Sequence, residues 1–299
     1  MLKALAEGVL ASSVARLATR GRRRGRALIL AYHGVTPDGE PPAGERALFV
    51  SERDFARQLD MLADVADVVP LNQLDDPPSE RARVAITFDD AYHGAVSVGV
   101  RELVRRQLPA TIFAAPGRLD RHVFWWDALA DASGVLDATT RHRALHECGG
   151  DDERVRAWAA SASFPTSDAL PVYARSATRA ELRAAVANVG ITVASHTWSH
   201  ANLTSLTEQS FAAELARPLE WLRTEFAASA MPWLAYPYGL ETTAVRHAVS
   251  EAGYSSAVLV EGGWHTAGDV SRFARPRLNV PGGVSARGFR ARLFGARRA

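Results

Sequence analysis

The chain has 299 residues, of which 47% are apolar and 23% charged, and its net charge is only +2. This composition supports a large buried core and excludes a largely disordered chain. The single cysteine, Cys148, excludes an internal disulfide. We expect one α/β unit rather than several domains, because barrels of this class often reach this length as a single domain.

The first 26 residues form a segment of their own. Apolar residues recur near the helical period from Leu2 to Leu17, and charged residues interrupt them, which indicates an amphipathic helix rather than a signal peptide or a membrane span. A basic run follows, made of Arg20, Arg22, Arg23, Arg24 and Arg26. The run could bind anionic lipid or a phosphorylated glycan carrier, or it could be a solvated linker. No aromatic residues interleave it, so we expect no nucleic-acid partner.

These features give an expectation for the location of the protein. Without a signal peptide we expect it in the cytoplasm, where the basic segment could make peripheral contact with the inner membrane face. The partner would then be a lipid-linked sugar or another glycan precursor rather than finished wall polymer.

Short apolar strands alternate with helices from residue 27 onward. Strands are predicted at 27–32, 68–70, 83–88, 109–115, 191–194, 232–236, 256–260 and 275–280. Helices are predicted from residue 51 and at 97–107, 178–188, 205–227 and 242–252, with a short basic helix at the end. Residues 119–178 are irregular and are interpreted as a helical insertion over one face. The alternation, without a glycine-rich dinucleotide fingerprint, predicts a (β/α) barrel over residues 27–299.

Two adjacent carboxylates end the clearest strand, in the motif Thr-Phe-Asp-Asp at 87–90. If strand geometry persists, the side chains of Asp89 and Asp90 point to different sides, so that one can bind a metal while the other orients water. Alone, the pair is weak evidence for a functional site, because Asp residues that start loops commonly cap helices.

Two histidines follow the strand at 191–194, in Ser-His-Thr-Trp-Ser-His. The spacing of four lets His196 and His200 face one metal from a helical turn or from a tight loop. A divalent metal held by one carboxylate and two imidazoles keeps open positions for water and substrate. Without the carboxylates, two ordinary surface histidines would be an equally good interpretation.

Two further candidates lie at strand ends. His33 follows the first strand, and a histidine there is either a hydrogen-bonded structural residue or a general acid. The segment Tyr236-Pro237-Tyr238-Gly239 is either a turn or a rigid loop whose backbone N–H donates to an oxyanion.

These motifs, in this order, resemble those of the polysaccharide deacetylases of carbohydrate esterase family 4, and Leu-Ala-Tyr-His-Gly-Val at 30–35 resembles the opening of many members. The resemblance spans roughly residues 29–280. It implies a distorted (β/α) barrel in carbohydrate metabolism that removes N-acetyl groups from amino sugars with a divalent metal, zinc first and Co²⁺ or Ni²⁺ as alternatives. It also implies Asp89 as the general base, Tyr238 as the oxyanion donor, and Asp90, His196 and His200 as metal ligands.

The sequence departs from the family pattern in two places. The arginine usually found shortly before Pro-Tyr is replaced by Leu234, Ala235 and Tyr236, and a cation from Arg275 or Arg277 on another strand is one candidate replacement. The C-terminal Leu-x-His motif with the general acid is also absent. Some members resemble a circular permutation in which an N-terminal Tyr-His does this work, so His33 is our candidate acid.

Tryptophans and one arginine are candidates for substrate contact. Trp125, Trp126 and Trp264 could stack on a pyranose, with Trp264 as the most exposed, although core packing explains at least one of the adjacent pair. Arg277 is a further candidate. Two other functions stay open, a non-catalytic carbohydrate-binding protein on the same fold and a hydrolase of small non-sugar amides.

Overall fold

The computed structural model describes residues 25–77, 80–266, 268 and 270–293. The predicted N-terminal amphipathic helix and most of the basic run lie outside these residues, so the expected membrane contact and location stay predictions. Among the helices that the structure describes, none is both long and apolar enough to cross a membrane.

Seven parallel strands close into a barrel, and an eighth and a ninth extend it. The barrel order is β1, β11, β9, β8, β7, β6 and β5, and β5 pairs again with β1. The strands of the barrel are β1 (Arg26–Tyr32), β5 (Ala82–Phe88), β6 (Ala110–Ala114), β7 (Ile191–Ser195), β8 (Ala230–Ala235), β9 (Ser256–Gly262) and β11 (Arg275–Asn279). Strand β4 (Ala66–Val68) pairs with β5, and β10 (His265–Thr266) runs antiparallel to β1. The predicted (β/α) barrel is therefore confirmed.

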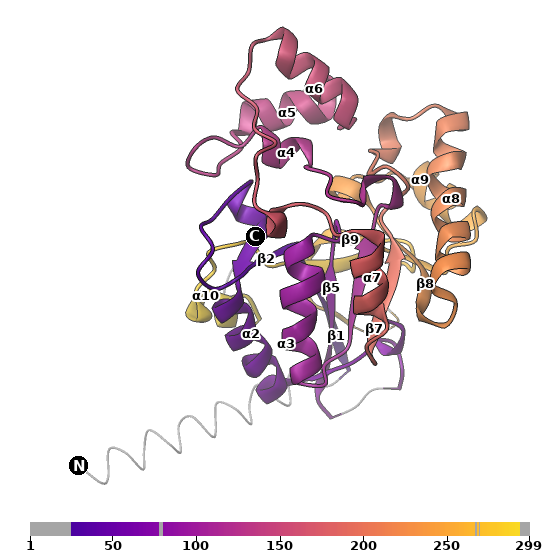
Figure 1. The fold of residues 1–299 in the computed structure, drawn as a ribbon. Helices are drawn as coiled ribbons and strands as arrows, with labels where there is room; N and C mark the ends of the chain where they lie inside the picture. The colour runs from indigo at the N-terminus through magenta and orange to yellow at the C-terminus, as the bar shows by residue number, and fades with distance from the viewer. Residues whose placement is uncertain (1–24, 78–79, 267, 269, 294–299) are drawn as a thin grey trace.

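Helices surround the barrel, as Figure 1 shows. They are α2 (Glu52–Val65), α3 (Val100–Arg105), α7 (Arg179–Val186), α8 (Glu208–Phe226), α9 (Thr243–Glu251) and α10 (Ala286–Leu293). A π-helical turn at Ala95–Gly99 leads directly into α3. Three more helices lie in the irregular segment, α4 (Trp125–Ala128), α5 (Ala138–His146) and α6 (Asp152–Ser161). In Figure 1 these three lie together beyond the end of the barrel.

Apolar residues of the strands face both the barrel interior and the surrounding helices. In β1, Ala27 and Ile29 pack in the interior cluster, whereas Leu28 and Leu30 pack in the larger outer cluster, and all four are at most 1% exposed. A strand buried on both faces reads as a continuous apolar run, which is why the sequence pattern located these strands well.

Two small features were not predicted. Strands β2 (Gly34–Thr36) and β3 (Phe49–Ser51) form a separate parallel pair that lies outside the strand ranges predicted from the sequence. Strand β10 was also missed, because two residues give no periodic signal.

Candidate active site

The carboxyl ends of the strands bring the candidate residues together. The backbone N–H of Asp89 donates to the carbonyl of Tyr32 at 2.9 Å, which joins the ends of β5 and β1. The N–H of His196 donates to the carbonyl of Ala114 at 2.9 Å and joins β7 to β6. The candidates that follow β1, β5 and β7 therefore lie at one end of the barrel.

Three buried side chains form a cluster of possible metal ligands, Asp90, His196 and His200. The Nε2 atoms of His196 and His200 lie 3.5 and 3.1 Å from Asp90 Oδ1, and one possible ligand atom from each residue lies within 4.8 Å of the others. All three residues are at most 6% exposed. One carboxylate and two imidazoles are a donor set suited to Zn²⁺ and similar ions.

The protonation of this cluster also fits a metal. His196 Nδ1 lies 2.8 Å from the carbonyl of Ala235, so it carries the proton there and leaves the Nε2 lone pair facing Asp90. Burial lowers the pKa of His196 and lowers that of His200 to about 3, so both rings stay neutral. Burial raises the pKa of Asp90, and its Oδ1 is a buried atom with no hydrogen-bond partner among the described residues. A divalent cation would compensate this carboxylate.

Left-handed backbone conformations shape the loops of the site. Asp90, His200 and Tyr238 have φ angles of 67°, 59° and 61°. Residues other than glycine rarely adopt this region, and they do so where the surrounding structure compels it, often at functional sites. The turn at Asp90 separates the two carboxylates. The segment with His196 and His200 is a tight loop rather than a helical turn.

Asp89 is paired with an arginine and is not among the possible metal ligands. Arg277 donates from both terminal nitrogens to Asp89, at 2.7 and 2.6 Å, and also binds Thr87 Oγ1 at 3.1 Å. Burial acts to raise the pKa of Asp89, but the charge and hydrogen bonds of Arg277 outweigh it and hold that pKa well below its ordinary value. Asp89 is therefore ionised at neutral pH.

This arrangement corrects the interpretation of Arg277 as a substrate contact. Its side chain is 0% exposed and is hydrogen-bonded inside the barrel. Arg277 is therefore the cation beside Asp89, which was the alternative role suggested for it. Arg275 does not share this place, because it binds Asp75 and Ser256.

His33 lies next to both carboxylates. Burial lowers its pKa, while the negative charges of Asp89 and Asp90 act in the opposite direction. Its Nδ1 is buried and has no hydrogen-bond partner among the described residues. The ring is therefore not tied into a structural hydrogen bond through that atom, as a purely structural histidine would be.

Tyr238 packs its ring 4.7 Å from that of His200. Its hydroxyl donates to the carbonyl of Gly150 at 2.8 Å and accepts from Trp125 Nε1 at 3.0 Å. Gly150 fits only as glycine, because an added Cβ would lie 2.7 Å from the Tyr238 ring and its φ is +68°. The segment before α6 is thus fastened to the site.

The predicted sugar contacts of Trp125 and Trp264 are wrong. Trp125 is 1% exposed and its ring is buried beside Tyr238, so no face is open to a pyranose. Trp264 lies on the outer wall of the barrel, where its Nε1 donates to the carbonyl of Leu293 in α10 at 2.8 Å. The chain folds back along β1 at β10, which the sequence did not reveal, and this carries Trp264 away from the site.

Sequence reasoning missed that aromatic side chains enclose His200, and it named one of them, Trp126, only as a possible sugar contact. The rings of Trp126 and Phe124 lie 4.8 and 5.9 Å from that of His200. Their motif, Phe-Trp-Trp-Asp, was visible in the sequence. The motif lies far from the histidines in the sequence, so no pattern indicated that it packs on them.

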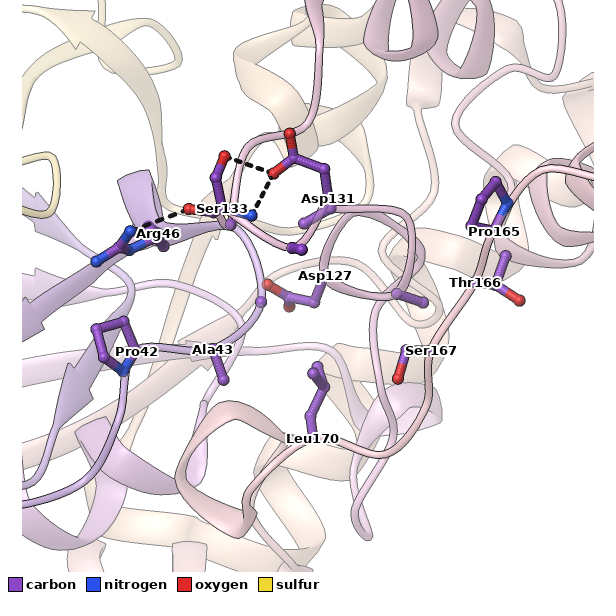
Figure 2. A pocket seen from close by; sticks show the side chains of 15 residues that line it. Pro42, Ala43, Arg46, Asp127, Asp131, Ser133, Pro165, Thr166, Ser167 and Leu170 are labelled. Atoms are coloured by element: carbon purple, nitrogen blue, oxygen red, sulfur yellow. Dashed lines mark hydrogen bonds between the residues drawn. The ribbon is translucent and has the colours of Figure 1, made fainter.

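A separate pocket of about 500 Å³ lies beside this motif. Figure 2 shows it between the segments near Pro42, Asp131 and Pro165, with Asp127 in its wall. None of its lining residues belongs to the metal-ligand cluster, so the pocket and the candidate active site are different places.

A closed (β/α) barrel with ionisable side chains gathered at the carboxyl ends of its strands has the architecture of a barrel enzyme. The family profile described as polysaccharide deacetylase matches residues 76–257. The chain therefore belongs to the polysaccharide deacetylase family, and this membership supports a deacetylase that acts on glycans. No curated protein sequence matches the chain.

Several solved structures resemble this fold at low sequence identity. A polysaccharide deacetylase from Bacillus cereus has a TM-score of 0.62 and 17% identity, covering 90% of this chain and 69% of its own. The Streptococcus pyogenes deacetylase PplD, solved in complex with acetate, has a TM-score of 0.60 and 16% identity, covering 90% and 98%. IcaB from Ammonifex degensii has a TM-score of 0.58 and 18% identity, covering 90% and 95%. At this identity the likeness supports the fold.

Proposed function

We propose that this protein is a metal-dependent hydrolase that removes N-acetyl groups from an amino-sugar-containing glycan or glycan precursor. One observation carries the proposal. The buried cluster of Asp90, His196 and His200 lies beside an ionised carboxylate, Asp89, that Arg277 holds in a bidentate pair. Family membership supplies the class of substrate, an acetylated glycan.

The residues have complementary tasks in amide hydrolysis. Asp89, ionised at neutral pH, accepts a proton from the attacking water as the new C–O bond forms. The backbone N–H of Tyr238 donates to the oxygen that gains negative charge. His33, in the protonated form that the charges of Asp89 and Asp90 favour, gives its proton to the departing amine as the C–N bond breaks, so that acetate and a free amino sugar result. A divalent ion bound by Asp90, His196 and His200 would polarise the acetamide carbonyl and lower the pKa of the water.

Arg277 supports catalysis over a merely binding role. The departure from the family pattern before Pro-Tyr gave reason to suspect a protein that binds glycans without hydrolysing them. The structure contains a cation at Asp89 from β11, so the argument from a missing arginine loses its basis.

The test is acetate release from N-acetylhexosamine oligomers, from lipid-linked sugars and from small acetamides, by metal-stripped protein and by protein reloaded with Zn²⁺ or Co²⁺. We expect acetate release from one of the two sugar classes, and we expect it only from protein that has been reloaded with metal. Release that is unchanged by metal removal would contradict the metal dependence. Glycan binding without any release would favour a binding protein, and release from small acetamides alone would favour the amidase alternative.

A further inference from the structure

The two histidines of the metal-ligand cluster are supported in different ways. His196 donates its Nδ1 proton to the carbonyl of Ala235, which is how a metal-binding histidine is usually oriented. The Nδ1 atom of His200 is buried and forms no hydrogen bond to another described residue. The orientation of the His200 ring must therefore come from packing.

Aromatic rings from the insertion and from the loop after β8 supply this packing. The ring of Trp126 lies 4.8 Å from that of His200 at an interplanar angle of 52°, and the Tyr238 ring lies 4.7 Å away at 85°. Phe124 lies further away, at 5.9 Å. These contacts leave the imidazole with Nε2 directed at Asp90 Oδ1, 3.1 Å away.

Trp126 is itself held on two sides. Its ring stacks on that of Phe124, with centroids 4.6 Å apart and planes 10° apart. Its Nε1, which can only donate, donates to the hydroxyl of Tyr92 at 2.8 Å. A tryptophan that is 5% exposed and fixed in this way has little freedom to turn.

A buried carboxyl completes the support. The Tyr92 hydroxyl donates to Asp127 Oδ2 at 2.5 Å, which turns its lone pairs toward Trp126. Asp127 Oδ1 accepts from the backbone N–H of Glu45 at 2.8 Å. The hydrogen bonds therefore run in one direction, from Trp126 through Tyr92 to Asp127, and Tyr92 and Asp127 are at most 2% exposed.

We propose that Trp126 is a positioning residue for the candidate metal ligand His200, and that Tyr92 and Asp127 hold Trp126 in place. The inference rests on the proposed metal site. It gives the insertion a task in the site, because the insertion supplies by ring packing the orientation that a second-shell hydrogen bond gives His196. Partners of this kind commonly change metal affinity by about 10- to 100-fold.

The test measures the Kd of Co²⁺ by chelator competition and the visible absorption spectrum of the bound Co²⁺. We expect Trp126→Leu to weaken binding by about 10- to 100-fold and to alter the spectrum, because the ring platform is gone. We expect Trp126→Phe, which keeps a ring but loses the N–H, to lie between Trp126→Leu and the wild type. Because Trp126→Leu is also the variant more prone to misfold, Trp126→Phe keeps the test decisive.

Trp158→Phe is the matched control. Trp158 lies in α6 of the same insertion and packs on Phe164 and Arg143, away from the metal-ligand cluster. We expect its Kd and Co²⁺ spectrum to equal those of the wild type. An equal loss in Trp158→Phe would assign the effect to general loosening of the insertion and overturn the proposal.

The remaining outcomes separate this inference from the proposed function. If wild type, Trp126→Phe and Trp126→Leu bind Co²⁺ with the same Kd and spectrum, the positioning role is wrong while the metal site stands. If the wild type binds neither Co²⁺ nor Zn²⁺, the metal dependence and the positioning role fall together.

Discussion

Strand β11 carries two arginines that form ion pairs at opposite ends of β5. Arg275 binds Asp75, in the loop before β5, and Arg277 binds Asp89, directly after it. In the first pair the side chain of Asp75 is 37% exposed, whereas in the second pair the side chains are 0% and 3% exposed. A partly solvated pair adds little stability, and a fully buried pair must overcome the desolvation of both charges. The difference suggests that the Arg277 pair serves the site, and the Arg275 pair only the fold.

The largest difference is expected between two single variants, each of which breaks one of these ion pairs. Arg277→Met leaves a buried, unpaired carboxylate, so we expect it to lower the free energy of unfolding by roughly 3–5 kcal/mol and to abolish acetate release. Arg275→Met leaves Asp75 free to turn to solvent, so we expect a loss of at most about 1–2 kcal/mol with unchanged acetate release. Urea unfolding and acetate release measure both variants.

Equal effects of the two substitutions would refute the distinction between the pairs. Arg277→Lys sharpens it, because lysine keeps the charge but cannot make the bidentate contact with Asp89. We expect this variant to fold better than Arg277→Met and to release acetate more slowly than the wild type.

A smaller effect is expected at His33, which neighbours Asp89 without taking part in the ion pair. His33→Gln removes the proposed proton donor to the amine, so we expect acetate release to fall by about 100-fold or more. The Kd of Co²⁺ should stay the same, because His33 is not among the proposed ligands. His247→Gln, at a histidine on α9 with a 73% exposed side chain, is the control. If His33→Gln released acetate at the wild-type rate, His33 would not be the general acid.

The last comparison concerns Asp127, another buried carboxyl, which is bound by a phenol and a backbone amide rather than by a cation. Burial raises its pKa to about 8, whereas an unfolded chain gives about 3.9. The folded state then holds a proton that the unfolded state releases, so the free energy of unfolding falls as pH rises from about 4 to about 8, by at most about 1.4 kcal/mol per pH unit.

Asp127→Asn should remove that part of the pH dependence. The measurement is urea unfolding of the metal-free wild type and variant across this pH range. As pH rises, the free energy of unfolding of the variant should increase relative to that of the wild type. A constant difference would mean that Asp127 is ionised throughout, as Asp89 is.

The sequence predicted the barrel and the placing of most candidate residues because both depend on local patterns. Strands buried on both faces appear as apolar runs, and residues that directly follow parallel strands must meet at one end of a barrel. For this reason Asp90, His196 and His200 lie together as expected, although the conformation of the histidine loop was left between two alternatives.

Contacts that cross the chain could not be predicted in the same way. Arg277 lies 188 residues from Asp89, and nothing local distinguishes it from Arg275. Trp264 was misplaced because β10 reverses direction within two residues. The support of His200 by Trp126, Tyr92 and Asp127 joins segments that no periodic pattern relates.

The most direct test of the account compares Asp89→Asn with Asp90→Asn in Co²⁺ binding and acetate release on the same samples. The two residues are adjacent in sequence, yet one faces Arg277 and the other faces two histidines. We predict that Asp89→Asn binds Co²⁺ as the wild type does and releases no acetate, and that Asp90→Asn loses Co²⁺ binding. Turnover by Asp89→Asn, or wild-type Co²⁺ affinity in Asp90→Asn, would contradict the division of tasks between the two carboxylates.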